Sequence, residues 1–166
     1  VAYDDDGRRL PVGERGELRL SGAPGGGWRP LLGYWVDGGV RPPEPGPVRT
    51  GDIGSVDADG WLTVVDRKKL VIIRGGANVY PLEVERVLTS HPDVVRAAVC
   101  GVPDDRLGQR VAALVQSDRP LDRDALTALC RQRLSAYKVP EIWVPVGELP
   151  VNAMGKVQRT ALPGLV

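Results

Sequence analysis

The sequence predicts an α+β protein made of two parts. Residues 1–66 show strand-like alternation and turn motifs without helical periodicity, whereas helical and strand patterns alternate from about residue 70 onward. A chain of 166 residues is long enough for one ordinary domain or two small ones, with a buried core. We therefore place a boundary at 66–70, and no internal repeat is visible on either side of it.

The first part is predicted to contain strands around a long connector. In residues 17–21 ("ELRLS") polar and apolar residues alternate, as they do in a strand. Residues 22–47 form a connector rich in Gly and Pro, and a connector of this length is typical of a functional loop or of one that covers another part of the protein. Residues 48–56 and 61–65 predict a hairpin, because the Asp and Gly residues of "DADG" supply the backbone angles of a turn. These strands alone bury little surface, so they indicate part of a larger β unit.

The second part is predicted to alternate strands and helices. The strand "LVIIRGG" runs into a glycine pair, and "YPLEVERVLTS" predicts a helix with Pro81 in its first turn and with Glu83 and Glu85 near its positive N-terminus. The runs "VVRAAVC" and "VAALVQ" predict buried strands, and "EIWVPV" predicts a last strand. The segment "DRDALTALCRQRL" predicts a helix with Asp122 as its N-cap. The apolar faces of the two helices comprise Val84, Val87, Leu88, Leu126, Leu129, Cys130 and Leu134.

Composition narrows the class of protein. The 22 Lys and Arg nearly balance the 21 Asp and Glu, which argues against nucleic acid or a membrane surface as a bulk partner, and no apolar stretch is long enough to span a bilayer. Cys100 and Cys130 fall in apolar patterns without metal-ligand spacing, and no secretory signal is visible. We expect both to be reduced core residues of a cytoplasmic protein without a metal site, with a disulfide as the alternative.

Three short segments carry side chains suited to a phosphate or nucleotide ligand. In "VRTGD", Asp52 stands on a Gly turn at a strand end, where a carboxylate can accept hydrogen bonds from a diol, although an ordinary β-turn explains it as well. In "DRKKLVIIRGGAN", basic residues stand beside two glycines that allow close backbone approach, with a solvated face or a linker as the alternative. In "MGKV", Lys156 is either a cation for phosphoryl oxygens or part of a solvated tail.

Seven motifs follow one another along the chain: "GYW" (33–35), "RTGD" (49–52), "DGWLTVVDRKK" (59–69), "IIRGGANVYPLEVE" (72–85), "GVPDDRLGQ" (101–109), "LSAYKVP" (134–140) and "MGKVQR" (154–159). Together and in this order they resemble the motifs of the adenylate-forming enzymes, which comprise acyl- and aryl-CoA synthetases, nonribosomal adenylation domains and luciferases. The form of the fourth motif is similar to that of the acyl-CoA synthetase branch.

The resemblance implies roles for individual residues. Asp52 of the "TGD" motif would hold the ribose hydroxyls of adenosine, and Arg67 would also reach the ribose. Lys156 would be the catalytic lysine that contacts the carboxylate and the α-phosphate during adenylation. This role is physically consistent, because a cation offsets the repulsion between an attacking carboxylate and a phosphate.

The resemblance also implies a domain map. Residues 1–66 would be the incomplete last β subdomain of a large N-terminal domain, with part of a distorted β-barrel. Residues 67–69 would be a hinge centred on Lys69, and residues 70–166 the small C-terminal domain, a short sheet flanked by helices. The small domain swings between two half-reactions, which brings a glycine loop to line the approach of the thiol. That loop comprises Gly75, Gly76 and Asn78.

Other family features are not found in this sequence. The phosphate loop, the adenine motif and the acyl pocket belong to the large N-terminal domain, and the glycines at 25–27 lack the Ser, Thr and Lys of a phosphate loop. We expect the parent enzyme to use ATP and Mg²⁺ to activate a fatty or other small organic acid and to transfer it to coenzyme A. The isolated chain is expected to be inactive and to hold none of these ligands tightly.

Three alternatives remain at this point. The parent could load the phosphopantetheine of a carrier protein instead of free coenzyme A. The chain could be a stand-alone interaction module that complements a separate large-domain protein. It could also be an α+β fragment with no function of its own.

Overall fold

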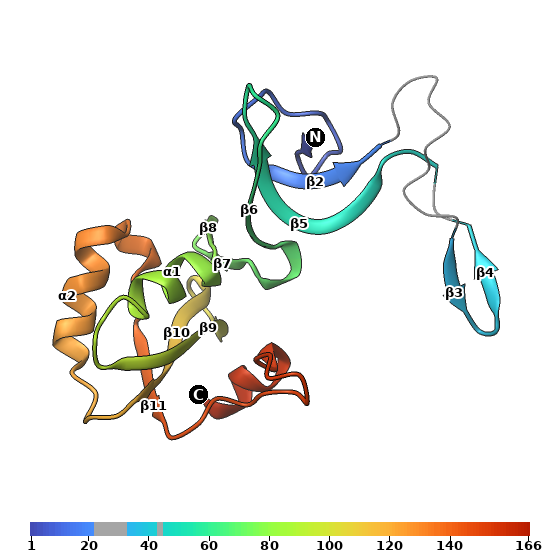
Figure 1. The fold of residues 1–166 in the computed structure, drawn as a ribbon. Coiled ribbons are helices and arrows are strands. Elements are labelled where there is room, and N and C mark those ends of the chain that lie inside the picture. Colours follow the sequence, from blue (N-terminus) through green and yellow to red (C-terminus); the bar gives the residue numbers. More distant parts are fainter. Residues whose placement is uncertain (22–32, 43–44) are drawn as a thin grey trace. The chain divides into compact units, whose positions relative to one another are not determined.

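The computed structural model describes residues 1–21, 33–42 and 45–166 (Figure 1). The chain divides into two compact units, Val1–Lys69 (unit 1) and Leu70–Val166 (unit 2). Strands make up the regular structure of the described part of unit 1, up to a short 3₁₀ helix at its end, whereas unit 2 mixes helices and strands. The predicted α+β class is confirmed.

Unit 1 contains a four-stranded antiparallel sheet in the order β1-β2-β5-β6. Among the described residues this sheet is open, as expected of a partial barrel. The predicted strand at 17–21 and the predicted hairpin are both present. The strands of the sheet are β1 (Ala2–Tyr3), β2 (Gly16–Leu20), β5 (Val48–Val56) and β6 (Leu62–Arg67), followed by the 3₁₀ helix η1 (Lys68–Leu70).

A second hairpin, β3 (Tyr34–Val36) with β4 (Gly39–Arg41), lies inside the segment that was predicted to be a connector. Its turn residues Asp37 and Gly38 both have positive φ, 50° and 79°, which is the geometry that an Asp-Gly hairpin turn provides. Strands of three residues are too short to show alternation in the sequence. The glycines at 25–27 lie outside the described residues.

Unit 2 is built on a five-stranded sheet with the path β11-β10-β7-β8, in which β9 also pairs with β10. Strand β11 runs parallel to β10, and the other pairs are antiparallel. The strand predicted to run into a glycine pair is present as β7, and β8, which follows the glycines, pairs with it in a hairpin. The elements are β7 (Ile72–Arg74), β8 (Ala77–Val79), α1 (Pro81–Leu88), β9 (Val94–Asp104), β10 (Gly108–Ser117), α2 (Arg123–Arg133), η2 (Ala136–Lys138), β11 (Ile142–Val146) and η3 (Arg159–Leu165).

Strands β9 and β10 are buried on both faces, as their continuous apolar runs predict. Val111 and Val115 of β10 pack in one cluster with apolar side chains of α1 and α2. Leu114, which points to the opposite face, packs instead with Leu149 and Leu162 of the C-terminal segment. The two α-helices therefore cover one face of the sheet, and the C-terminal segment with η3 covers the other.

Both predicted α-helices are present, with the predicted starts. Pro81 occupies the first turn of α1, where its missing N–H is not needed, and Val84 and Leu88 are fully buried. The side chain of Asp122 accepts a hydrogen bond from the Ala125 N–H at 2.9 Å, so it is the N-cap of α2. Within the described residues no helix combines the length and the apolar character that crossing a bilayer requires.

Candidate functional site

The "TGD" motif forms a tight corner within β5. Gly51 has a φ of 72°, which a side chain would disfavour, and this conformation turns the chain between Thr50 and Asp52. The Thr50 hydroxyl donates to the Leu18 carbonyl at 2.7 Å and accepts from the Asp52 N–H at 3.0 Å. The Asp52 carboxylate is therefore carried by a backbone that is fixed to the neighbouring strand.

Arg67 lies directly across the sheet from Asp52. The two residues are register partners on β5 and β6, and the Arg67 Nε lies 2.8 Å from the Asp52 Oδ1. The Asp52 side chain is 27% exposed and that of Arg67 is 58% exposed, so both remain open to a ligand. The structure thus brings together the two residues that the sequence assigned to one nucleotide.

A cavity of about 410 Å³ lies beside Arg67 and the two residues that precede Asp52. Its volume lies in the range of sites for small molecules. It is lined by Thr50, Gly51, Arg67, Lys68 and Lys69. We take it as the candidate site because motif residues line it on both sides.

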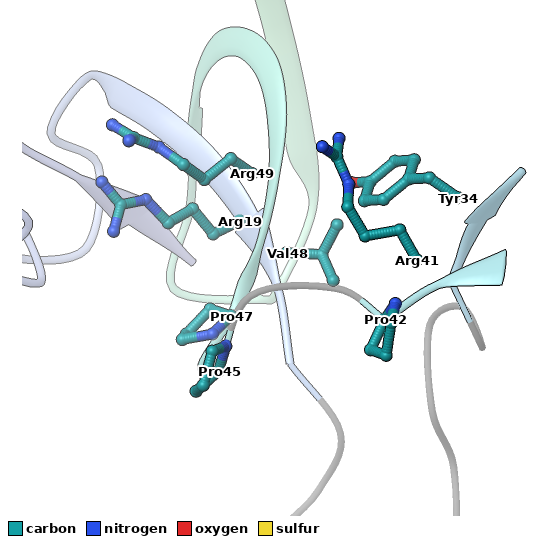
Figure 2. Close-up of a pocket in the computed structure, with 8 residues that line it drawn as sticks. All are labelled: Arg19, Tyr34, Arg41, Pro42, Pro45, Pro47, Val48 and Arg49. Carbon is teal, nitrogen blue, oxygen red and sulfur yellow. The ribbon is translucent and has the colours of Figure 1, made fainter. Parts of the chain in front are cut away.

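Unit 1 has a larger cavity, of about 520 Å³, that contains none of the motif residues singled out for nucleotide chemistry (Figure 2). In Figure 2 the side chains of Arg19 and Arg49 lie side by side and point in one direction, while Arg41 extends alongside Tyr34. Although this cavity is larger, its lining includes neither Asp52 nor Arg67, so we do not take it as the candidate nucleotide site. The lining residues are Arg19, Tyr34, Arg41, Pro42, Pro45, Pro47, Val48 and Arg49.

Lys68 ties the end of unit 1 to its sheet. Its Nζ lies 2.7 Å from Asp5 Oδ1 and 3.6 Å from the buried Glu17 carboxylate, which also accepts hydrogen bonds from Arg49 (3.1 Å) and Arg19 (3.3 Å). Burial raises the pKa of Glu17, but the Arg49 hydrogen bond and the three positive charges outweigh it and hold the pKa below its ordinary value. Lys68 is thus largely neutralised by its own unit.

The glycine pair forms the turn of the β7–β8 hairpin in unit 2. Gly75 and Gly76 have φ of 55° and 81°, and the Gly75 N–H donates to the Leu107 carbonyl at 2.8 Å. Asn78 follows on β8 with its side chain exposed. The segment predicted to face the thiol is therefore a tight, exposed turn, and its role stays a prediction.

Arg74, at the base of that turn, is committed to an ion pair. Its Nε and Nη2 donate to the two carboxylate oxygens of Glu141 at 3.0 and 2.9 Å. The hydrogen bond from Arg74 holds the pKa of Glu141 below its ordinary value, and Arg110 adds to this at 3.8 Å. Of the basic cluster in "DRKKLVIIRGGAN", Arg67, Lys68 and Arg74 are thus already paired with carboxylates.

Lys156 lies on an exposed turn in the C-terminal segment of unit 2. The Asn152 Oδ1 accepts hydrogen bonds from the N–H groups of Met154 and Lys156, both at 3.0 Å, and Gly155 has a φ of 75°. The turn is therefore organised by Asn152 and not only by glycine. Among the described residues, none pairs with the Lys156 ammonium, which leaves it available to an anion.

The two cysteines and the possible metal ligands are the remaining groups that could carry chemistry. Cys100 and Cys130 are free and buried, and burial raises the pKa of each thiol to about 11. The prediction of unpaired core cysteines is confirmed. In the part of the chain that the structure describes, no three His, Cys, Asp or Glu side chains gather to hold a metal ion.

Residues 83–156 match the family model of the AMP-binding enzyme C-terminal domain. The chain is 38% identical over 164 residues to 2-succinylbenzoate–CoA ligase of Bacillus licheniformis, which aligns 98% of this chain with 33% of that protein. It is 40% identical over 162 residues to long-chain-fatty-acid–CoA ligase of Yersinia pestis, with 96% of this chain and 28% of that protein aligned. Its fold matches the o-succinylbenzoate coenzyme A synthetase of Bacillus subtilis in complex with ATP and magnesium ion, with a TM-score of 0.78, 32% identity, and coverage of 97% of this chain and 33% of that one.

This chain belongs to the adenylate-forming superfamily. It corresponds to the C-terminal portion of AMP-forming acyl-CoA ligases, and the family predicted from the seven motifs is confirmed. The chain spans about a third of the length of the curated relatives it matches.

Sequence reasoning missed the partners of two glutamates in the fourth motif. Glu85 was placed near the N-terminus of α1, but its carboxylate instead pairs with Arg159 at 2.6 and 2.8 Å. Glu83, in the first turn, pairs with Lys138 at 2.8 Å. A Lys or Arg far along the sequence gives no local signal of its partner, so only the fold reveals these pairs.

Proposed function

We propose that this chain forms the C-terminal part of an enzyme that uses ATP to convert a carboxylic acid into an acyl-adenylate and then transfers the acyl group to coenzyme A. The observation that carries the proposal is the cross-strand pair of Asp52 and Arg67, of which Arg67 lines a cavity of about 410 Å³. The match over nearly the whole chain to acyl-CoA ligases supports it.

The proposed nucleotide contacts follow from hydrogen-bonding chemistry. A carboxylate can accept hydrogen bonds from both hydroxyls of a ribose diol. The Arg67 Nε, 2.8 Å from Asp52 Oδ1, orients the carboxylate, and the remaining N–H groups of Arg67 can donate to ribose oxygens. The fixed Thr50 corner holds the carboxylate ready before the nucleotide binds.

Lys156 is the proposed catalytic residue of the first half-reaction. A carboxylate that attacks the α-phosphate meets a like charge, and an ammonium close to both offsets that repulsion and stabilises the negative charge on the phosphoryl oxygens. An exposed turn without an ion-pair partner for the lysine, among the described residues, suits this task because no internal bond must break first.

The second half-reaction is proposed to use a different face of the small domain. In this proposal residues 1–66 belong to the last β subdomain of the large domain, 67–69 form the hinge with Lys69 as pivot, and 70–166 swing as one body. The swing would withdraw the lysine and bring the turn of Gly75 and Gly76, with Asn78, to the thiol's approach. The division into compact units after Lys69 supports this map.

The acid substrate is proposed to be a fatty acid or another small organic acid, because the relatives named above act on a fatty acid and on succinylbenzoate. ATP, magnesium and coenzyme A would be bound chiefly by the large domain. The 166-residue chain alone is accordingly proposed to be inactive.

The deciding experiment measures the two half-reactions separately in the ligase that carries this chain. Acid-dependent exchange of pyrophosphate into ATP, over a panel of acids, reports adenylation, and thioester formation from a supplied acyl-adenylate reports the second step. Lys156→Ala is expected to slow adenylation by about 10²–10³-fold, by analogy with loss of one oxyanion-hole donor, and to leave the second step nearly unchanged. Absence of acid-dependent exchange with every acid would overturn the proposed function.

The same experiment identifies the acceptor. Coenzyme A and a carrier protein bearing phosphopantetheine present the same thiol, so each is supplied in turn to the acyl-adenylate complex. We expect faster transfer to coenzyme A. Transfer to the carrier protein alone would instead show that the parent loads a carrier.

A further inference from the structure

A partly buried ion pair fastens the segment that carries Lys156 to the rest of unit 2. The two guanidinium nitrogens Nη1 and Nη2 of Arg159 donate to Glu85 Oε1 and Oε2 at 2.6 and 2.8 Å. Glu85 Oε1 also accepts the Val99 N–H at 2.8 Å. Its side chain is only 9% exposed, so one carboxylate joins helix α1, strand β9 and the start of η3.

Lys156 sits on a narrow two-armed ribbon, residues 150–158, whose C-terminal arm leads directly into Arg159. The arms are joined by the hydrogen bonds from Asn152 N to the Lys156 carbonyl (2.9 Å) and from Gln158 N to the Pro150 carbonyl (2.8 Å). A bridge between Val151 and Val157 lies between these two bonds. Lys156 is therefore only three residues from the arginine that pairs with the buried Glu85 carboxylate.

The ribbon needs anchors at its base because a two-stranded ribbon is barely stable by itself. The N-terminal arm follows Leu149, which is 1% exposed in the core of unit 2, and Leu162 is fully buried beyond the C-terminal arm. Apolar contacts of this kind hold a segment down but do not fix its direction, since they are not directional. A bidentate Arg–carboxylate pair does fix direction, because both N–H···O bonds must align.

We propose that Glu85 and Arg159 are a positioning pair that sets the direction of the Lys156 ribbon for adenylation. The proposal rests on the function proposed above for Lys156. Neither residue needs to touch the substrate, because the Arg159 guanidinium bonds to the Glu85 carboxylate and that carboxylate also accepts the Val99 N–H. Their effect on the reaction passes through the placement of the lysine ammonium.

The first test measures the ribbon itself, without any assay of activity. In the 166-residue chain, Arg159→Met is expected to speed hydrogen exchange of the Asn152 and Gln158 amides by about tenfold or more, because the ribbon then opens locally. The Ala113 amide, in the core strand β10, is expected to keep its protection and so to show that the fold persists. Arg119→Met, which removes an exposed arginine paired with Asp93, is the matched control and is expected to change none of these amides.

The second test uses the two half-reactions of the ligase that carries this chain. Arg159→Met is expected to slow adenylation by about ten- to a hundredfold, the size of effect that a misplacement of about 1 Å can have, and to leave thioester formation from supplied acyl-adenylate within about twofold. Two milder variants are compared with it: Arg159→Lys keeps the charge but loses the two parallel N–H donors, and Glu85→Gln keeps the shape but loses the charge. We expect their adenylation rates to lie between those of wild type and Arg159→Met.

Two results would overturn the positioning role. One is unchanged exchange at Asn152 and Gln158 in Arg159→Met. The other is an equal loss in both half-reactions for the milder variants Arg159→Lys and Glu85→Gln, which indicates a general structural role. If the wild-type ligase proved not to adenylate any acid, the proposed function would fail, whereas the exchange result would still decide whether the pair holds the ribbon.

Discussion

At the scale of the residue, the cations of this chain divide into those with an internal partner and those without one. Arg67, Lys68 and Arg74 each face a carboxylate at 2.9 Å or less. Among the described residues, none pairs with the ammonium groups of Lys69 or Lys156. The two lysines proposed to act in adenylation and at the hinge are therefore those whose movement breaks no ion pair within the described chain.

The role of Asp52 leads to a prediction for nucleotide binding. Asp52→Asn in the ligase keeps the size of the side chain but removes the charge that Arg67 and a ribose diol both use. Loss of a charge-assisted hydrogen bond of about 1.5–3 kcal/mol corresponds to about ten- to a hundredfold weaker AMP binding, measured by titration calorimetry. Asp59→Asn, in the exposed turn before β6, is the control. Equal affinities for Asp52→Asn and wild type would remove Asp52 from the nucleotide site.

The two cysteines give a prediction about thiol reactivity. Because burial raises the pKa of Cys100 and Cys130 to about 11, almost no thiolate is present near neutral pH. We expect iodoacetamide at pH 8 to leave both unmodified in the native chain and to alkylate both in denaturant, as counted by mass spectrometry. Rapid native alkylation of either residue would show that its site opens to solvent.

The sequence could indicate Asp52 and Lys156 because each stands in a short contiguous motif, but it could not indicate what holds them. The partner of Glu85 lies 74 residues away, and that of Arg74 lies 67 residues away. Pairing over such separations depends on the fold, and many arginines in this chain are equally plausible partners from sequence alone. The supporting contacts of the site therefore required the structure.

At the scale of the element, whether a helix or strand could be predicted depends on its length and on the residues in its turns. The long apolar runs of β9 and β10 and the capped helix α2 were predicted because many residues carry one signal. The strands of β3–β4 and β7–β8 have three residues each, too few for a periodic pattern. Their turns, Asp37-Gly38 and Gly75-Gly76, were the available signal.

The β7–β8 turn allows a prediction about backbone strain. Gly76 has a φ of 81°, and a Cβ added there would meet no atom within 4 Å, so alanine at this position brings strain without a clash. We expect Gly76→Ala to lower the free energy of unfolding by about 1–2 kcal/mol, measured by urea titration. Gly147→Ala is the control, because Gly147 has equal space and no positive φ. Equal effects of the two substitutions would contradict a strained turn.

The Arg74–Glu141 pair, which joins β7 to the start of β11, predicts a pH dependence. The hydrogen bond from Arg74 lowers the pKa of Glu141 below its ordinary value of 4.5. The pair's contribution is therefore complete above that value and is lost as pH falls through the lower, folded-state pKa. Glu141→Gln is expected to flatten the loss of stability below pH 4.5, measured by urea titrations at several pH values. An unchanged acid profile would mean that the pair contributes nothing in solution.

At the scale of the whole molecule, the two units meet at a single peptide bond along the chain, with no linker between them. The compact units divide between Lys69 and Leu70, and Lys68, on the unit 1 side, is fixed by Asp5 and Glu17. Because Lys68 is anchored, a change in the backbone angles of Lys69 would move unit 2 and leave Lys68 in place. This arrangement supports Lys69 as the proposed pivot between the two half-reactions.

Lys69→Pro tests that pivot in the ligase that carries this chain. Proline fixes φ at position 69 and disfavours the helical conformation that Lys68 has in η1. A single permitted conformation can serve one half-reaction only, so we expect one step to fall by about tenfold or more while the other stays near wild type. Pyrophosphate exchange and thioester formation from supplied acyl-adenylate measure the two steps, and Asp118→Pro, in the exposed segment after β10, controls for introducing a proline. Normal rates in both steps for Lys69→Pro would show that the domains turn about another residue, and equal losses in both would show damage to the fold instead of a trapped conformation.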